Sequence, residues 1–349
     1  MKRLTASLIM ATALTTAATA QTAVEGTTYY LPKTALRVSM LIEKTTYQPG
    51  QLAPYAERYM SVLHPKLNAS TDYRIVSLQL STVAIPDTAK QYTLALDKKH
   101  SITLVGRTPD GILTGINAEA RLPEPPKPFV AKPKPRPLDP TDFMNEDILR
   151  ATSSAKQAEL VASDIYDLRN SRTELSRGEA EYMPKDGEQL RLMMGQLNQQ
   201  ERALLQVFEG TTVRDTVEQV LIFTPMQEMS RQVLFRFSEK LGLREADDLS
   251  GAPYYISIED LKTVTPAGGQ AAETKKDKND INLYVNIPSK IKATIASQQA
   301  PVKSIEFLAG QFGKTENLSG ELFGKKQSTQ VLLDPMTGSV VSLKAITIE

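Results

Sequence analysis

Eight prolines fall within the eighteen residues from Pro123 to Pro140. Proline fixes φ and lacks a backbone N–H donor, so neither a helix nor a central strand can form across such a run. Basic residues between the prolines keep the segment solvated, and its extended chain should reach roughly 3.1 Å per residue. We therefore predict a Pro-rich linker over residues 122–142. A plain interdomain tether is favoured, and a docking segment with polyproline geometry is the alternative.

The first twenty residues have the pattern of a cleavable secretory signal. Lys2 and Arg3 precede an uncharged run that ends in Ala18-Thr19-Ala20, with small residues at the last and third-last positions. We predict a signal peptide over residues 1–20 and a mature chain that begins at Gln21. A lipid anchor would need a Cys there, and the chain has no Cys. The expected location is periplasmic or secreted, with no transmembrane span in the mature chain.

The segment before the linker, residues 21–121, is dominated by strand patterns. Thr27–Leu31 and Ala35–Thr46 are rich in β-branched and aromatic residues, which suit a pleated, half-buried surface. A turn signal at Tyr47-Gln48-Pro49-Gly50 is followed by the apolar spacing of one short helix over 51–62. We expect a β-rich N-terminal domain over residues 21–121. Its further strands are predicted at 73–84, 91–96, 101–105 and 112–116.

After the linker the apolar spacing becomes heptad-like. One seam runs through Val161, Ile165, Leu168, Arg172 and Leu175, and a second through Leu190, Met194, Leu197, Glu201, Leu204 and Phe208. Gly178, Pro184 and Gly187 separate them, so we predict an antiparallel helical hairpin over residues 143–209. If Leu175 faces Leu190, Arg172 lies opposite Met193 and Glu201 lies opposite Asp164. In that register the two polar interruptions do not meet, and Ile165, Leu168, Leu197 and Leu204 pack internally.

From residue 210 to residue 349 strand patterns return, and we expect a β-sandwich-like C-terminal domain. Asp334-Pro335-Met336-Thr337-Gly338 predicts a hairpin loop between the last two strands, because Pro suits a type I turn and Gly a left-handed position. A polar stretch with three lysines predicts a mobile loop at 264–280. The predicted fold class is α+β: a β-rich N-terminal domain, the Pro-rich linker, and an antiparallel helical hairpin attached to the β-sandwich-like C-terminal domain.

Composition removes several classes of chemistry. Removal of residues 1–20 leaves 39 basic and 40 acidic residues, and this balance gives no general attraction to nucleic acid. Zinc is usually held by clustered Cys and His, but the two histidines, His64 and His100, are 36 residues apart. No Gly-x-Ser-x-Gly elbow and no phosphate-binding loop occurs. We therefore predict no catalytic, cofactor-binding or metal-ligating residue, and an enzyme is the less favoured reading.

A set of ordered segments resembles a known family. The mature chain opens with Thr28-Tyr29-Tyr30-Leu31-Pro32-Lys33-Thr34-Ala35-Leu36-Arg37, followed by Glu43-Lys44-Thr45-Thr46-Tyr47 and Gln48-Pro49-Gly50. Met183-Pro184-Lys185-Asp186-Gly187, Leu234-Phe235-Arg236-Phe237-Ser238 and Leu322-Phe323-Gly324-Lys325-Lys326 come later. In this order they resemble the domain-of-unknown-function 4831 family, exported proteins of Gram-negative gut-type bacteria. The resemblance implies export and a single family architecture, and it carries no activity or functional residue.

Three functions follow as hypotheses. The first is a soluble periplasmic or secreted, non-enzymatic binding or scaffold protein of the cell envelope, with an envelope protein or a glycan as partner. The second is a hydrolase acting on envelope glycans or peptides, which a concave acidic pocket would favour. The third is an accessory subunit of an outer-membrane complex, docking through the hairpin or the linker. A continuous exposed apolar patch on the hairpin would favour the third.

Overall fold

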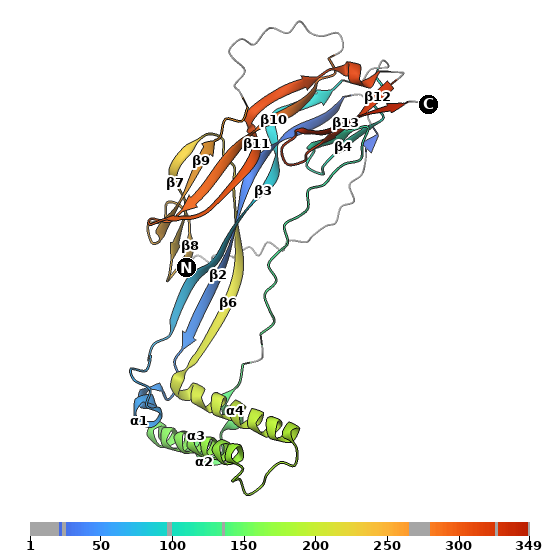
Figure 1. Ribbon diagram of the computed structural model, residues 1–349. Coiled ribbons are helices and arrows are strands. Elements are labelled where there is room, and N and C mark those ends of the chain that lie inside the picture. Colours follow the sequence, from blue (N-terminus) through green and yellow to red (C-terminus); the bar gives the residue numbers. More distant parts are fainter. Residues whose placement is uncertain are drawn as a thin grey trace.

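The computed structural model describes residues 21–22, 26–95, 100–134, 137–264, 280–324 and 327–347. The predicted signal peptide, residues 1–20, and nearly all of the loop predicted at 264–280 lie outside the described residues. The structure is 46% strand and 23% helix, which confirms the predicted α+β class. The molecule is elongated, with a β-rich body at one end and a group of helices at the other (Figure 1).

Three antiparallel sheets contain all the strands of the described residues. The first has the order β1-β4-β5-β12-β13, the second β11-β10-β9-β7-β8, and the third β3-β2-β6. The strands are β1 (Gln21–Thr22), β2 (Thr27–Gln48), β3 (Ser70–Leu94), β4 (Leu104–Arg107), β5 (Leu113–Ile116), β6 (Thr211–Phe223), β7 (Met229–Ser238), β8 (Gly242–Arg244), β9 (Ala252–Asp260), β10 (Leu283–Ala296), β11 (Pro301–Leu318), β12 (Gln327–Leu333) and β13 (Val340–Thr347).

The sheets do not divide along the boundary expected between an N-terminal and a C-terminal domain. In the first sheet β5 pairs with β12, where Ile116 lies opposite Val331. In the third sheet β2 pairs with β6 over its lower half, where Val38 lies opposite Leu221. The expectation of two separate β units, residues 21–121 and 210–349, is therefore corrected: strands from both segments complete each other's sheets. Non-local pairing of this kind leaves no local signature in a sequence.

The body is held by two apolar cores. One packs Tyr29, Leu113 and Phe323 between the first sheet and the upper ends of β2 and β10. The other is sandwich-like: Leu36, Val38 and Met40 of β2 pack against residues of β7, β9 and β10 such as Phe235 and Ile291. The expected sandwich therefore exists, but one of its layers comes from the N-terminal segment. Burial along β2 is close to continuous: no residue from Tyr29 to Ile42 is exposed.

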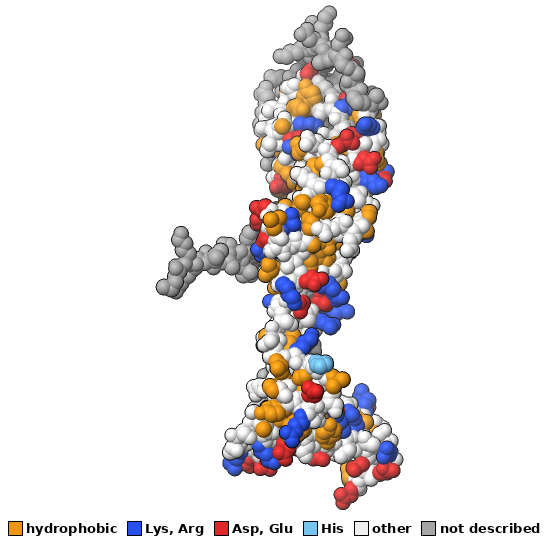
Figure 2. Space-filling view, turned by 90° about the vertical axis from the view of Figure 1, so that its left-hand side faces the viewer, with side chains coloured by type: hydrophobic (Ala, Val, Ile, Leu, Met, Phe, Trp, Pro, Cys, Tyr) orange, Lys and Arg blue, Asp and Glu red, His pale blue; other side chains and the backbone are white. Residues whose placement is uncertain are grey.

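Below the body, the third sheet continues as a narrow stalk formed by residues 43–48, 70–75 and 211–217, and the molecule is thinner there (Figure 2). The stalk ends at the foot, residues 49–69 and 137–210. The helices of the foot are η1 (Ala53–Tyr55), α1 (Ala56–Met60), η2 (Pro140–Phe143), α2 (Glu146–Leu149), α3 (Ser154–Arg177) and α4 (Gly187–Glu209); η3 (Gly320–Phe323) lies in the body. The foot has its own core around Ile148, Val161, Ile165, Leu204 and Phe208.

The Pro-rich segment connects body and foot on the outside of the stalk (Figure 1). Residues 119–134 and 137–139, here called the strap, form neither helix nor strand, while the last part of the predicted linker forms η2. Glu218 of β6 holds the middle of the strap, because its Oε2 accepts the backbone N–H of Phe129 at 3.0 Å. Lys134 pairs with Asp215, three residues before Glu218 on β6. The strap thus follows β6 down to the foot.

Candidate functional site at the helical foot

The ends of the two long helices are fixed by local sequence. Ser153 caps α3 by accepting the N–H of Lys156, and Asp186 caps α4 by accepting the N–H of Gln189 at 2.7 Å. Gly178 ends α3 in the left-handed conformation, with φ of 76°. Side-chain oxygens at the N-cap and a glycine past the last turn are the usual helix boundaries. The predicted antiparallel pair is confirmed.

The register of this pair differs from the prediction. Glu201 and Arg172, expected not to meet, form an ion pair, and Arg169 Nε donates to Glu201 Oε1 at 2.6 Å. Arg172 also donates to Asn198 Oδ1 at 2.9 Å. Two guanidinium groups can satisfy both oxygens of the carboxylate of Glu201, a residue that is only 8% exposed, and this is a stronger arrangement than polar groups that do not meet. Relative to the predicted register, in which paired residue numbers sum to 365, these contacts shift α4 by five to eight residues, about one and a half to two helical turns.

Because of this shift, Leu175 lies near Leu197 instead of Leu190, and both line a hollow of about 470 Å³ at the free end of the hairpin. The start of α4 extends past the end of α3, and no described helix lies opposite it (Figure 1). Leu192, on this part of α4, is 60% exposed. The other residues that line the hollow are Ser171, Met193, Gln196 and Gln200. An apolar surface therefore stays uncovered where the sequence predicts a closed seam.

A second hollow, of about 250 Å³, continues the first toward the centre of the foot. It is lined by Phe143, Asp164, Asp167, Leu168, Ser171, Gln200 and Leu204. Ser171 and Gln200 line both hollows, so the two form one groove along the line where α3 meets α4. We call it the hairpin groove. The prediction of an internal seam is thus met at Ile165 and Leu204, which are buried, whereas Leu168 and Leu197 are half-buried and line the groove.

The inner end of the hairpin groove is acidic. Burial raises the pKa of Asp164, and the nearby carboxylates of Asp167 and Asp147 raise it further. Asn145 Nδ2 donates to Asp164 Oδ2 at 2.9 Å, which orients that side chain. In the part of the chain that the structure describes, none of these three carboxylates forms an ion pair, whereas the nearby Glu146 and Glu159 do. The groove therefore has one negative end and one apolar end.

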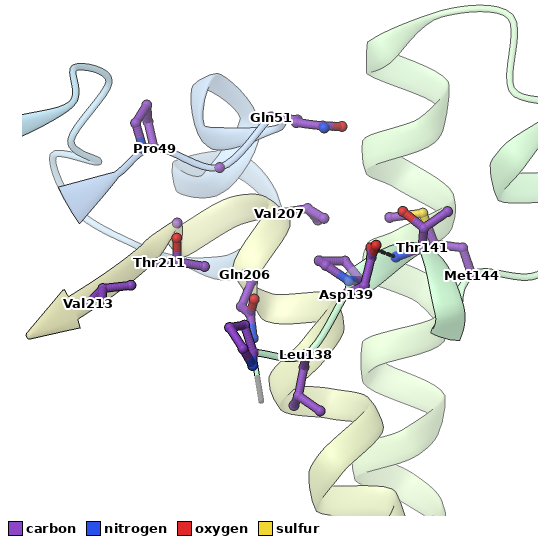
Figure 3. A pocket seen from close by; sticks show the side chains of 14 residues that line it. Pro49, Gln51, Leu138, Asp139, Thr141, Met144, Gln206, Val207, Thr211 and Val213 are labelled. Carbon is purple, nitrogen blue, oxygen red and sulfur yellow. Dashed lines mark hydrogen bonds between the residues drawn. The ribbon is translucent and has the colours of Figure 1, made fainter. Parts of the chain in front are cut away.

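A larger hollow, of about 510 Å³, lies where the strap, the stalk and the foot meet (Figure 3). Figure 3 shows Asp139 and Thr141 on one side of it and Gln206 and Val207 of α4 on another. The Asp139 carboxylate accepts the N–H of Thr141 at 2.9 Å, and this bond lowers its pKa. That carboxylate caps η2 and is already engaged. We interpret this junction as structural, because the Asp139 carboxylate is hydrogen-bonded within the chain.

Two glycines permit the close contacts of this junction. A Cβ on Gly50 would lie 2.2 Å from Val207 O, and a Cβ on Gly210, whose φ is 77°, would lie 2.3 Å from Gln48 O. Tyr47 adds a further tie, because its hydroxyl lies 3.0 Å from both Lys66 O and Glu209 O. The end of β2, the approach to β3 and the end of α4 are thereby held together. The orientation of the foot is fixed at this point.

The structure keeps the two histidines apart. His64 is exposed in the loop between α1 and β3, at the foot, and His100 precedes β4 in the body. Across the described ranges, no group of three or more His, Asp or Glu side chains could hold a metal ion. No described helix is both long and apolar enough to cross a membrane. No sequence motif marks the residues of the hairpin groove. The one sequence signal for the groove is that the heptad seam of α4 is longer than that of α3.

Comparison with known proteins gives one finding. No curated protein and no solved structure matches the chain. A family model described as a domain of unknown function, DUF4831, matches residues 25–341, which span the body, the stalk, the strap and the foot. The chain belongs to the DUF4831 family.

Proposed function

We propose that this chain is a non-enzymatic binding or scaffold protein of the cell envelope, and that the hairpin groove is its binding surface. Export would follow from the signal pattern of residues 1–20, with the mature protein periplasmic or secreted. The observation that carries the proposal is the hairpin groove itself, whose apolar hollow is left open. Its two helices lie at the opposite end of the molecule from the body (Figure 1). Soluble proteins seldom leave such surfaces uncovered without a use.

The architecture supports presentation of this surface to a partner. The stalk and the strap both run from body to foot, and the junction around Gly50, Gly210 and Tyr47 fixes the direction of the helices. A rigid support reduces the ordering cost of binding, because the groove is already formed. A scaffold that holds a partner at a set distance from its body would need this combination of length and rigidity.

An accessory subunit of an outer-membrane complex is the second candidate. Exposed apolar side chains on and beside the hairpin favour it: Tyr166 is 45% exposed, Tyr182 69% and Leu192 60%. In that case the groove would be covered permanently by another subunit. Fractionation separates the two candidates, because a subunit stays with outer membranes at high salt and a binding protein is released in the soluble fraction.

A site-specific crosslink tests the proposal. A photoreactive phenylalanine analogue placed at Leu192, in the groove, should capture an envelope protein or a glycan-bearing species in intact cells. The same analogue at Leu241, which is 53% exposed in the turn between β7 and β8 of the body, is the matched control. Capture at position 241 alone, or at neither position, would contradict the groove as the binding surface. Intact mass of the exported protein, starting at Gln21, tests the signal prediction.

A further inference from the structure

We infer that the hairpin groove takes an amphipathic helix of another polypeptide that carries a lysine or arginine at one end of its apolar face. The inference rests on the proposed function and adds the chemistry of the partner. It follows from the apolar lining at one end of the groove, from the carboxylates at the other end, and from the ion pairs formed by the charged residues nearby.

The dimensions of the groove suit a helix. Along α3 it extends from Asp164 to Leu175, a span of eleven helical rises that corresponds to about 16 Å. This length equals about three turns of a helix in the partner. Two parallel rows of side chains, one from α3 and one from α4, form a channel into which the ridge of a third helix fits. The apolar floor at Leu175, Met193 and Leu197 would receive two successive apolar side chains of that helix.

The charges at the inner end of the groove indicate which side chain the partner helix carries there. Glu201 forms ion pairs with Arg169 and Arg172, Glu159 with Lys156, and Glu146 with Arg150. The carboxylates of Asp147, Asp164 and Asp167 have no such partner among the described residues. At the apolar end, Arg191 pairs with Glu188 at 2.6 Å. Among the residues that line the groove, Asp164 and Asp167 carry the charge, and both lie at its inner end.

Burial makes this charge costly in the free protein. Asp164 is half-buried and faces two other carboxylates, so its ionised form is destabilised, as its raised pKa reflects. A cation from outside would relieve that repulsion and would be attracted by the Asp164 and Asp167 carboxylates that line the groove, with Asp147 nearby. A neutral or acidic helix would gain only the apolar contacts. The groove thus discriminates by charge at one end and by shape at the other.

Synthetic peptides test the inference on the full-length mature protein. The probes are three twelve-residue amidated peptides with the same apolar face and with Lys, Gln or Glu at the residues that would lie near Asp164. Fluorescence anisotropy at low salt should give the order Lys, then Gln, then Glu, with the Lys peptide at least about fivefold tighter than the Gln peptide. High salt should remove most of that difference.

Variants assign the effect to the groove. The double substitution Asp164→Asn with Asp167→Asn should bring the Lys peptide down to the affinity of the Gln peptide and leave the Gln peptide unchanged. Glu159→Gln, on the same helix but outside the groove, is the matched control and should change neither. Leu192→Asp should weaken all three peptides.

The outcomes separate this inference from the proposed function. Equal binding of the three peptides, or no binding, overturns the basic-helix inference, and crosslinking at Leu192 would still uphold the groove as the binding surface. If Leu192→Asp leaves binding of the Lys peptide unchanged, the peptide lies elsewhere and the inference fails. Loss of both the peptide effect and the crosslink rejects the inference and the proposed function together.

Discussion

Replacing Glu201 with Ala should loosen the helical hairpin more than replacing any other ionised residue on α4. The Glu201 side chain is 10% exposed, and its two oxygens are held by Arg169 and Arg172. Glu201→Ala leaves two guanidinium groups beside the core of the foot with no counter-charge. The hydrogen bond from Arg172 to Asn198 Oδ1, at 2.9 Å, would remain, but the neutral Asn198 amide does not compensate the positive charge.

The size of the effect follows from exposure. Removing one partner of a fully buried ion pair costs about 3–5 kcal/mol, whereas an exposed pair contributes roughly 0–1 kcal/mol. The arginine side chains are 37% and 34% exposed, so both can regain water once Glu201 is gone. We therefore expect a loss of about 2 kcal/mol, between the two limits. Glu188→Ala is the matched control, because Glu188 is 66% exposed and bonds Arg191 on its own helix; it should cost about 0.3–0.5 kcal/mol.

Hydrogen exchange measures this locally. The amides of α3 and α4 should open more easily by about 2 kcal/mol in Glu201→Ala, while amides of β10 in the body should be unaffected. Arg172→Ala combined with Glu201→Ala should then cost less than the sum of the single changes, since the pair is already broken. Strict additivity of the two changes, or a loss no larger than that of Glu188→Ala, would refute the role of this ion pair in setting the register.

Three further outcomes are expected. Ser39, which donates to Glu218 at 2.5 Å, is the main cause of the lowered pKa of Glu218, ahead of Phe129 N–H and Arg37. The stabilisation that the ionised Glu218 gives should be complete above the ordinary pKa of 4.5 and lost as the pH falls below it. Cleavage of the strap by an acid-active protease should therefore rise at low pH, and Glu218→Ala should show that cleavage already at neutral pH. Because the pKa of Asp164 is raised, its ionised form destabilises the fold; Asp164→Asn should raise the melting temperature at neutral pH, with no gain well below the ordinary value of 3.8, and a decrease at neutral pH would contradict this. Gly210→Ala should destabilise the junction by about 1–3 kcal/mol, seen as faster exchange in α4, because a Cβ would meet Gln48 O at 2.3 Å at a φ of 77°.

Local chemistry made several elements predictable. Because proline lacks a backbone N–H donor, the prolines predicted a segment without helix or central strand before η2, and the strap forms neither helix nor strand. The heptad spacings placed α3 and α4, and Gly178 and Gly187 marked the turn between them, with Gly178 in the left-handed conformation. Asp334–Gly338 forms the turn between β12 and β13, where Gly338 N–H donates to Asp334 O at 2.7 Å. Each of these depends on residues close together in the chain.

The candidate site could not be predicted in the same way. The hairpin groove exists because Arg169 and Arg172 hold Glu201 and thereby leave Leu192 and Met193 without a facing helix. Apolar spacing alone fits several registers, since successive turns of an amphipathic helix present similar faces. The acidic end of the groove needs Asp147 of α2 beside Asp164 and Asp167 of α3, and that proximity depends on how α2 folds back.

The sequence by itself determined the α+β class, the strap, the helical hairpin and the turns, because propensity, capping and proline stereochemistry act over a few residues. Only the tertiary structure decided that β6 completes the sheet of β2, that β12 pairs with β5, and that α4 is displaced along α3. The physical reason is the same in each case. Pairing partners more than a hundred residues apart, or alternative registers of equal apolar pattern, are selected by the total packing and ion pairing of the folded chain, which no short segment encodes.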